Sequence, residues 1–237
     1  MASPPNPLIV ALDRSDLNEA EALAEALAGT VGLLKVGLEL FTAAGPEAVR
    51  RIARHAPVFL DAKLHDIPNT VGRAAANLAR LGIRMLNVHA LGGEAMVRAA
   101  VDGAARGADA AGVPPPLILG VTVLSSLSGE SLASPASLAF EAHAAGAAGA
   151  VVSGDDVAVV REAMGEEFLL VVPGIRPSSS SLNDHARVLT PEEALQAGAD
   201  HLVVGRPVTD AADPAGAARS ILAEIHWSGL GSPSSEG

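Results

Sequence analysis

The chain has 237 residues, of which 49% are hydrophobic and 18% charged, and its formal net charge is −11. A chain of this length holds one or two domains and enough apolar residues for a large core. The negative charge and an aromatic content of 2% disfavour nucleic acid as a partner, because polyanions are bound by cationic and stacking side chains. No apolar run reaches the ~20 residues of a membrane span, so we expect no membrane partner either.

The N-terminal residues 1–7, MASPPNP, lack the basic region and the apolar stretch of a signal peptide. Cysteine is absent, which excludes disulfides and thiolate metal sites. Both features are compatible with the cytoplasm, and this is the location that we predict.

Eight short apolar runs alternate with Ala-rich amphipathic stretches along the chain. The apolar runs span residues 7–13, 32–38, 57–63, 84–90, 116–124, 149–153, 168–175 and 201–207. The helix-like stretches span residues 16–28, 45–55, 68–81, 93–107, 134–145, 154–164, 190–197 and 212–225. Continuous apolar runs flanked by helices are typical of parallel strands that are buried on both faces.

About eight such strand–helix units predict the α/β class and, within it, a single-domain (β/α)8 TIM barrel formed by residues 1–227. An open, doubly wound sheet is the alternative. Residues 228–237, rich in Ser, Gly and Pro, are expected to form a mobile tail. Two long Ser-rich segments, 124–135 and 176–191, are either lids over a site or tolerated surface insertions.

Polar side chains stand at or near the ends of the apolar runs. They are Asp13, Lys35, Asp61, Lys63, His89, Thr122, Arg176 and Arg206. In a barrel, catalytic groups come from the C-terminal ends of strands, so we expect these residues to converge. A turn is the alternative role for Asp13, and packing is the commoner role for lone histidines such as His65 and His89.

The stretch FLDAKLHDIPNT, residues 59–70, places two carboxylates and an ammonium at the end of an apolar run. Asp61 and Lys63 are two residues apart, so on a strand both point to the same face. Together with Lys35 and Asp66 they are expected to form an alternating cluster of two cations and two anions, which keeps the lysines charged. The alternatives are a structural salt bridge between Asp61 and Lys63, and capping of the next helix by Asp66.

Two arginine motifs predict a phosphate site. PGIRP (173–177) supplies Arg176, and VVGRP (203–207) supplies Gly205 and Arg206. The loops after strands seven and eight of a barrel frequently bind phosphate, and a guanidinium can donate two hydrogen bonds to it at once. These residues predict a phosphorylated small molecule whose reacting atom lies over the lysines and aspartates.

The run Asp61-x-Lys63-x-x-Asp66, continued by IPNT, resembles the signature of the orotidine 5′-monophosphate decarboxylase family. Further motifs recur in the family's order over nearly the whole chain: ALD with Asp13, LKVG with Lys35, VHALGG with His89, VTVLSS with Thr122 and Ser125, and both arginine motifs. The resemblance implies conversion of orotidine 5′-monophosphate to UMP and carbon dioxide, the last step of de novo pyrimidine synthesis, without a metal or organic cofactor.

The resemblance also implies roles for individual residues. Lys63 would protonate C6 of the pyrimidine, Asp61 would lie beside the scissile carboxylate, and Lys35 would pair with Asp61. Asp66 and Thr70 would reach the partner's site across a homodimer interface.

For substrate binding, the resemblance places Asp13 and Lys35 at the ribose hydroxyls. The remaining contacts would be Thr122 and Ser125 near the pyrimidine, and Arg176, Gly205 and Arg206 at the phosphate. His185 stands where the family commonly has a lid glutamine, and an imidazole can donate a hydrogen bond to phosphate.

Two other functions stay open. A metal-dependent sugar-phosphate lyase or aldolase shares the D-x-K-x-x-D pattern, although HDIPNT argues against it. A non-enzymatic nucleotide-binding protein needs only the phosphate site, and it has no reason to keep both lysines paired with aspartates.

Overall fold

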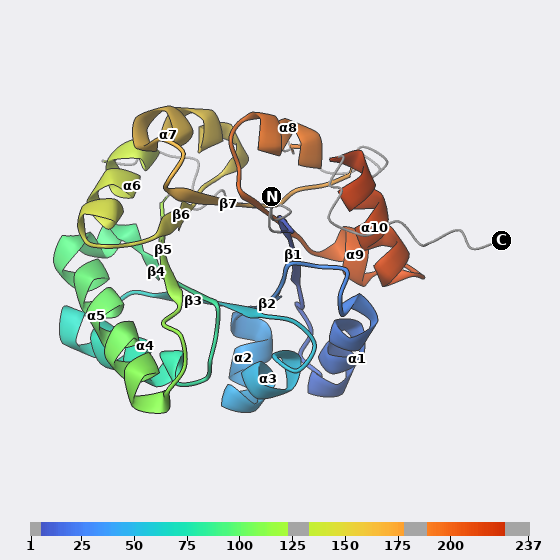
Figure 1. The fold of residues 1–237 in the computed structure, drawn as a ribbon, viewed down its shortest axis with the longest axis horizontal. Helices are drawn as coiled ribbons and strands as arrows, with labels where there is room; N and C mark the ends of the chain where they lie inside the picture. Colours follow the sequence, from blue (N-terminus) through green and yellow to red (C-terminus); the bar gives the residue numbers. More distant parts are fainter. Residues whose placement is uncertain (1–5, 123–132, 178–188, 226–237) are drawn as a thin grey trace.

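The computed structural model describes residues 6–122, 133–177 and 189–225, which form a closed barrel of eight parallel strands (Figure 1). The strands are β1 (Leu8–Ala11), β2 (Leu33–Val36), β3 (Val58–Leu64), β4 (Met85–His89), β5 (Leu117–Val121), β6 (Gly149–Val151), β7 (Leu169–Pro173) and β8 (His201–Val204). Each strand pairs with the next, and β8 closes on β1, where Leu8 pairs with Leu202 and Val10 with Val204. The TIM-barrel prediction is confirmed and the open-sheet alternative is wrong, because an open sheet would leave two unpaired edges.

Helices alternate with the strands and surround the barrel (Figure 1). They are α1 (Leu17–Leu27), α2 (Leu38–Ala44), α3 (Pro46–Ile52), α4 (Pro68–Ala79), α5 (Gly93–Ala111), α6 (Pro135–Ala144), α7 (Val157–Met164), α8 (Pro191–Gln196), α9 (Arg206–Thr209) and α10 (Pro214–Glu224), with 3-10 turns η1 (Ala90–Gly92) and η2 (Gly154–Asp156). The sequence pattern does not predict α2 or α9. The residues of α2 begin LELF, which continues the apolar run of β2, so hydrophobicity alone does not separate the two elements.

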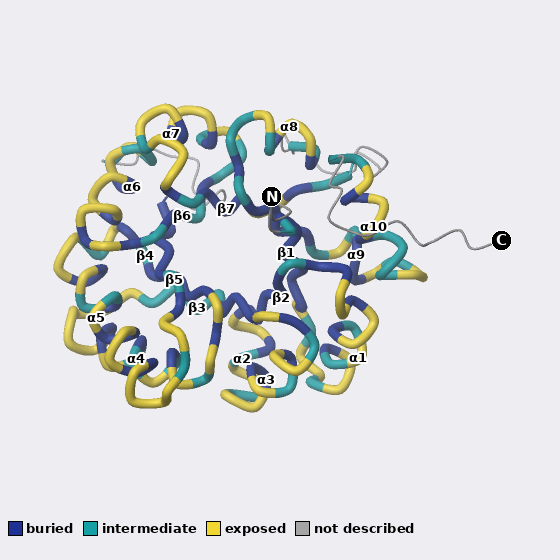
Figure 2. Tube along the Cα trace, in the orientation of Figure 1, coloured by how far each residue is buried: buried dark blue, intermediate teal, exposed yellow. Residues whose placement is uncertain are grey.

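The apolar side chains of the strands form two layers. One layer faces outward against the helices, and the other fills the barrel interior. The inner layer consists of Ile9, Ala11, Leu33, Phe59, Met85, Leu119, Val171 and Val203. Figure 2 shows that the strands are buried whereas the outer faces of the helices are exposed. Burial on both faces explains why the strands are continuous apolar runs and not alternating ones.

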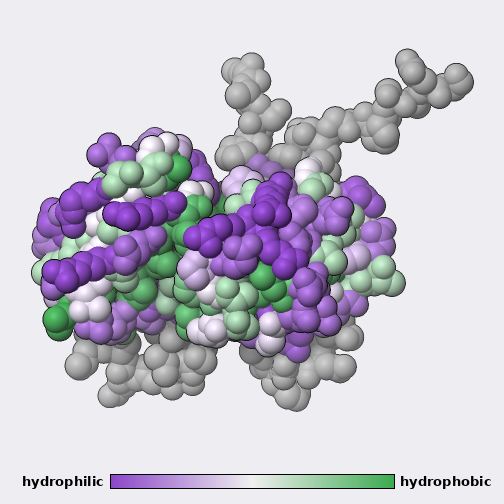
Figure 3. Space-filling view, turned by 90° about the horizontal axis from the view of Figure 1, so that it is seen from below, coloured by the Kyte–Doolittle hydropathy of each residue, from purple (hydrophilic) through white to green (hydrophobic). Residues whose placement is uncertain are grey.

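The outer surface carries the polar faces of the helices. The face in Figure 3 is mainly hydrophilic, with hydrophobic residues in narrower strips between the polar side chains. This arrangement is typical of amphipathic helices that bury one stripe against a core. In the described parts of the chain, no helix has the length and apolar character needed to cross a membrane.

Small residues bring α4 and α5 close together, and α4 begins just after the charged stretch of β3. A Cβ atom on Gly103 would lie 2.0 Å from the carbonyl oxygen of Gly72, and one on Gly107 would lie 2.0 Å from that of Ala76. A larger side chain at either position would push the helices apart. This packing sets the position of α4 and therefore of the β3–α4 connection that carries Asp66.

Candidate active site

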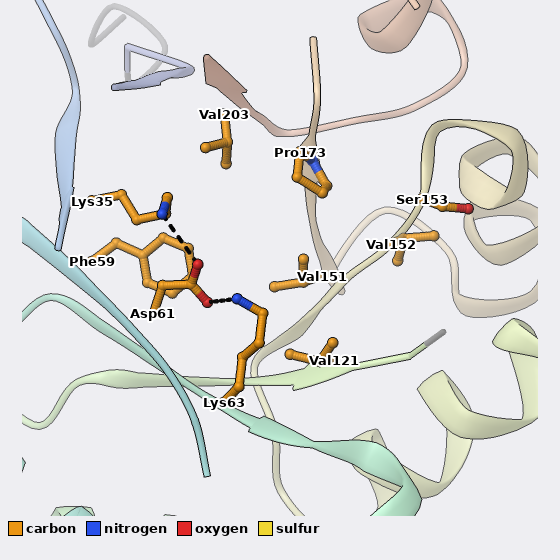
Figure 4. A pocket seen from close by; sticks show the side chains of 10 residues that line it. All are labelled: Lys35, Phe59, Asp61, Lys63, Val121, Val151, Val152, Ser153, Pro173 and Val203. Atoms are coloured by element: carbon orange, nitrogen blue, oxygen red, sulfur yellow. Dashed lines mark hydrogen bonds and ion pairs between the residues drawn. The ribbon is translucent and has the colours of Figure 1, made fainter. Parts of the chain in front are cut away.

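A cavity of about 230 Å³ lies at the carboxyl ends of the barrel strands (Figure 4). Its lining residues are Lys35, Phe59, Asp61, Lys63, Val121, Val151, Val152, Ser153, Pro173 and Val203. They come from β2, β3, β5, β6, β7 and β8 or directly follow them. Because enzymes of this fold place their active sites at this end of the barrel, the cavity is the candidate active site.

Asp61 lies between two lysines (Figure 4). Its Oδ2 atom is 3.2 Å from Lys35 Nζ, and its Oδ1 atom is 2.5 Å from Lys63 Nζ. Lys35 Nζ is also 3.2 Å from Oδ1 of Asp13. An alternation of two anions and two cations therefore occurs within this chain, but its second anion is not Asp66, which the family resemblance assigns to the site of a partner chain. Asp13 takes that place, because it follows β1, the strand that pairs with β2.

The Asp61 carboxylate is held in its ionised form. Its side chain is only 13% exposed, and this burial acts to raise its pKa. The charge of Lys35 and the hydrogen bonds from Lys63 and Asn87 outweigh burial, so the pKa of Asp61 lies below its ordinary value. A negative charge is thus fixed in the cavity between two ammonium groups.

Gly37 makes room for the ion pair between Lys35 and Asp13. A Cβ atom at position 37 would lie 3.0 Å from Lys35 Nζ and 3.2 Å from Asp13 Oδ1. A larger residue at position 37 would press on this pair, which explains on steric grounds why glycine ends the LKVG motif. Lys35 itself is only 8% exposed, and its contacts with two carboxylates offset the desolvation of the buried ammonium.

Strand β3 is irregular where it carries the site. Leu60 pairs with Leu86 and Leu64 pairs with Val88, so four steps along β3 correspond to two along β4. Lys63 has a φ of 46°, and no other non-glycine residue in the described ranges has a positive φ. This backbone conformation costs a residue with a side chain roughly 1–3 kcal/mol, so its surroundings must stabilise it.

Asn87, which is fully buried on β4, contacts both charged residues of β3. Its Oδ1 accepts a hydrogen bond from the Lys63 backbone N–H at 2.7 Å, and its Nδ2 donates one to Asp61 Oδ1 at 2.6 Å. Asn87 is not among the residues predicted from the sequence. A signal exists, because strand alternation turns this polar residue of the run MLNVH inward together with Met85 and His89.

The rest of the cavity wall is largely apolar. Side chains of Val121, Val151, Val152, Pro173 and Val203 surround the space in front of Lys63 (Figure 4). None of them is predicted as a site residue, because in sequence they do not differ from core residues of the same strands. An apolar wall lowers the local dielectric constant and thereby strengthens the electrostatic interactions of Asp61 and Lys63.

The two arginine motifs follow neighbouring strands. Arg176 comes after β7, Gly205 and Arg206 come after β8, and the two strands pair through Pro173 and Val203. Gly205 precedes the one-turn helix α9, and Arg206, its first residue, is exposed. A Cβ atom on Gly205 would lie 4.0 Å from Asp13 Oδ2, so this backbone lies next to the ion pair of Asp13 with Lys35.

Comparison with known proteins agrees with this geometry. Residues 6–221 match the Orotidine 5′-phosphate decarboxylase / HUMPS family. The chain belongs to this family. It is 52% identical over 233 residues to an orotidine 5′-phosphate decarboxylase of Anaeromyxobacter dehalogenans, covering 94% of this chain and 99% of the relative. The corresponding protein of Moorella thermoacetica is 49% identical over 230 residues, covering 92% and 91% of the two chains.

A solved structure shows the same relationship. The crystal structure of orotidine 5′-phosphate decarboxylase from Lactobacillus acidophilus has 38% sequence identity and a TM-score of 0.80, and the match covers 93% of this chain and 99% of that chain. Membership of the orotidine 5′-phosphate decarboxylase family, inferred above from short motifs, is confirmed.

Three other residues that the family resemblance assigns to the site take no part in these ion pairs within one chain. Asp66 and Thr70 are exposed, and Asp66 Oδ1 accepts a hydrogen bond from the backbone N–H of Ile67 at 2.6 Å. Helix α4 has no side-chain N-cap, so the capping alternative for Asp66 is wrong. Thr122 is buried directly after β5, where its hydroxyl donates to the carbonyl oxygen of Val151 at 3.2 Å.

The two histidines near the decarboxylase signature pack against each other. The ring centroids of His65 and His89 are 5.2 Å apart. Burial, and the nearby charges of His65 and Lys63, lower the pKa of His89 below its ordinary value. This agrees with the packing role expected for them.

Ser125 and His185 lie outside the described residues, as do most of the two lid candidates, 124–135 and 176–191. Among the residues that the structure describes, no three His, Asp or Glu side chains are grouped so that they could hold a metal ion.

Proposed function

We propose that this protein decarboxylates orotidine 5′-monophosphate to UMP and carbon dioxide, the last step of pyrimidine nucleotide synthesis. The observation that carries the proposal is the Asp61 carboxylate held between Lys35 and Lys63 in a barrel cavity. This array occurs in a chain about half identical to curated decarboxylases over more than nine tenths of its length. The enzyme is a carboxy-lyase, and its cytoplasmic location stays a prediction.

Lys63 supplies the chemistry at C6. When the bond between C6 and the carboxylate breaks, carbon dioxide leaves and an electron pair remains on C6. The ammonium of Lys63 is attracted more strongly as negative charge moves from the carboxylate onto C6, and it then gives its proton to form the C6–H bond. Only such differential stabilisation accelerates the reaction, because equal binding of both states leaves the barrier unchanged.

Asp61 keeps this ammonium in place. Its lowered pKa means that it stays ionised at neutral pH, and its Oδ1 atom accepts a hydrogen bond from Lys63 Nζ. In the complex, its charge faces the carboxylate of the substrate, which favours departure of carbon dioxide. The apolar wall receives the departing uncharged gas without a desolvation cost.

The other parts of the substrate are bound by residues at the ends of further strands. Asp13 and Lys35 hold the ribose hydroxyls, and Thr122 and Ser125 lie near the pyrimidine. Arg176, Gly205 and Arg206 bind the phosphate, and His185 closes over it. The support for the phosphate site is that both arginines follow β7 and β8, the usual phosphate position in this fold.

The active form is a homodimer in which Asp66 and Thr70 serve the partner's site. Support comes from apolar side chains exposed beside this region: Leu38 is 50%, Ile67 65% and Leu91 52% exposed. They follow β2, β3 and β4, so they flank one side of the barrel mouth. Burial of exposed apolar side chains against a second copy stabilises a dimer.

Decarboxylation is tested by the loss of absorbance as orotidine 5′-monophosphate becomes UMP, measured after exhaustive dialysis against EDTA. Full activity is expected, because the proposed mechanism uses only side chains of the protein. Activity that vanishes on chelation and returns with Mg²⁺ would assign the protein to the lyase alternative. The Lys63→Ala protein, purified in the same way, measures any activity that comes from a contaminating decarboxylase of the expression host.

Removing the Arg206 guanidinium tests the phosphate site. Arg206→Ala is expected to weaken substrate binding by roughly 2–4 kcal/mol, as when one partner of a charge-assisted pair is lost. The measurements are KM for the substrate and Kd for UMP and for uridine, which lacks the phosphate, so uridine affinity should not change. Arg219→Ala, which removes an exposed arginine of α10 that pairs with the N-cap residue Asp213, is the matched control. Unchanged UMP affinity in Arg206→Ala would place the phosphate elsewhere.

A further inference from the structure

Because of the bulge in β3, the Lys63 backbone lies outside the regular pairing of β3 with β4. Between Leu60 and Leu64 the pairing with β4 shifts, so the regular ladder is interrupted at the residues that carry the site. A buried backbone N–H without an acceptor is unfavourable, and a bulge creates this situation for the extra residues. The side chain of Asn87 on β4 provides the acceptor for Lys63, at 2.7 Å.

The same side chain also sets the position of Asp61. The amide group of Asn87 is planar, with its acceptor oxygen on Lys63 N–H and its donor nitrogen on Asp61 Oδ1 at 2.6 Å. Oδ1 of Asp61 is the atom that also accepts from Lys63 Nζ. One buried amide therefore ties the left-handed backbone of Lys63 to the carboxylate that holds the Lys63 side chain.

We infer that Asn87 is a positioning residue of the decarboxylase, which holds Lys63 and Asp61 in reactive geometry through its two hydrogen bonds. The inference rests on the proposed function. Asn87 does not line the cavity, so it acts through Lys63 and Asp61 and has no need to touch the substrate. If the amide only filled space in the core, an apolar residue of similar shape could replace it without a loss of kcat.

Asn87→Leu tests this directly, because leucine has the same number and branching of side-chain heavy atoms as asparagine but forms neither hydrogen bond. A misplacement of about 1 Å at a reacting group can cost about 100-fold in rate, so we expect a loss of at least this size in kcat. The affinity for UMP should change little, since phosphate and ribose contacts lie elsewhere. Val88→Ala, which removes buried volume from the outward face of the same strand, is the matched control and should retain kcat.

A spectroscopic measurement separates this inference from the proposed function. Lys35 and Lys63 are the only lysines in the chain, so protein labelled with ¹⁵N-lysine gives two backbone amide signals. In Asn87→Leu the Lys63 signal should move and lose its protection from hydrogen exchange, whereas the Lys35 signal should stay. This measurement does not depend on activity: an inactive wild-type protein would refute the proposed function alone.

Asn87→Asp keeps the shape of the side chain and remains informative if Asn87→Leu does not fold. A protonated aspartic acid supplies the one acceptor and the one donor that these two hydrogen bonds use, whereas the ionised form has no donor and repels Asp61. Lys63 on β3 and Lys35 on β2 are the cations that act on Asp61, and His89 lies two residues further along β4, whereas the β5 residue paired with position 87 is the apolar Leu119. The ratio of variant to wild-type kcat should therefore rise as the pH falls.

Three results would overturn the inference. They are a kcat of Asn87→Leu within a few-fold of wild type, a Lys63 amide signal that does not respond to the substitution, and an Asn87→Asp ratio that is independent of pH.

Discussion

Lys63→Ala is expected to lower kcat by at least several powers of ten. Each power of ten corresponds to ~1.4 kcal/mol of transition-state stabilisation. The loss is large because the substitution removes both the proton donor for C6 and the cation that stabilises the electron pair there. Single-turnover decarboxylation with enzyme in excess measures it, with UMP affinity as a test of the intact phosphate and ribose contacts.

Lys63→Arg separates the two roles of the lysine. Arginine keeps the positive charge beside Asp61 but does not release its proton, so it should restore electrostatic stabilisation without efficient proton transfer. We expect its kcat to lie between those of wild type and Lys63→Ala. Near-normal turnover in Lys63→Ala would show that this residue is only a member of a structural ion pair.

Mixing two inactive variants should restore activity if Asp66 serves the partner's site. Lys63→Ala and Asp66→Ala are each expected to be nearly inactive alone. In a heterodimer of the two, one site carries both lesions and the other carries neither, because two-fold symmetry makes the exchange reciprocal. Random equal mixing makes about half of the dimers hetero, so roughly a quarter of all sites become wild type.

The control is a mixture of Lys63→Ala with Asp61→Ala. Both lesions affect residues that meet within one chain, so every site of that heterodimer keeps one lesion and no activity returns. Subunit exchange is confirmed independently by mass spectrometry of differently tagged chains. Exchange without recovery in the first mixture would refute the shared site.

The fold was predictable because its pattern is local. Each β–α unit contributes one apolar run and one amphipathic stretch, and eight repeats of this order admit few arrangements other than a barrel. The boundaries were less predictable: α2 follows β2 after the single residue Gly37, and its leading residues Leu38 and Leu40 extend the apolar run. Tertiary packing, and not periodicity, divides this stretch into strand and helix.

Much of the candidate site was also predictable, for a topological reason. In a barrel of parallel strands all carboxyl ends lie at one end, so charged residues at the ends of apolar runs must converge there. Lys35, Asp61 and Lys63 therefore follow from their places in the sequence. A further signal is the use of lysine itself, because the other cationic side chains of the chain are all arginine.

Other features of the site depend on pairing between strands, which the order of residues does not contain. Within one chain, the second carboxylate beside the two lysines is Asp13, because β1 pairs with β2, whereas Asp66 lies in the exposed connection after β3 and can meet only another chain's site. The apolar wall is assembled from strands distant in sequence, so its valines read as ordinary core residues.

The order of residues alone therefore accounts for the barrel, the end at which the site lies and the charges that occupy it. How these charges are held depends on the pairing of strands in space. The left-handed backbone of Lys63 and its hydrogen bond to Asn87 arise from a register shift between β3 and β4. Such a shift is a property of two paired strands, and neither strand shows it alone.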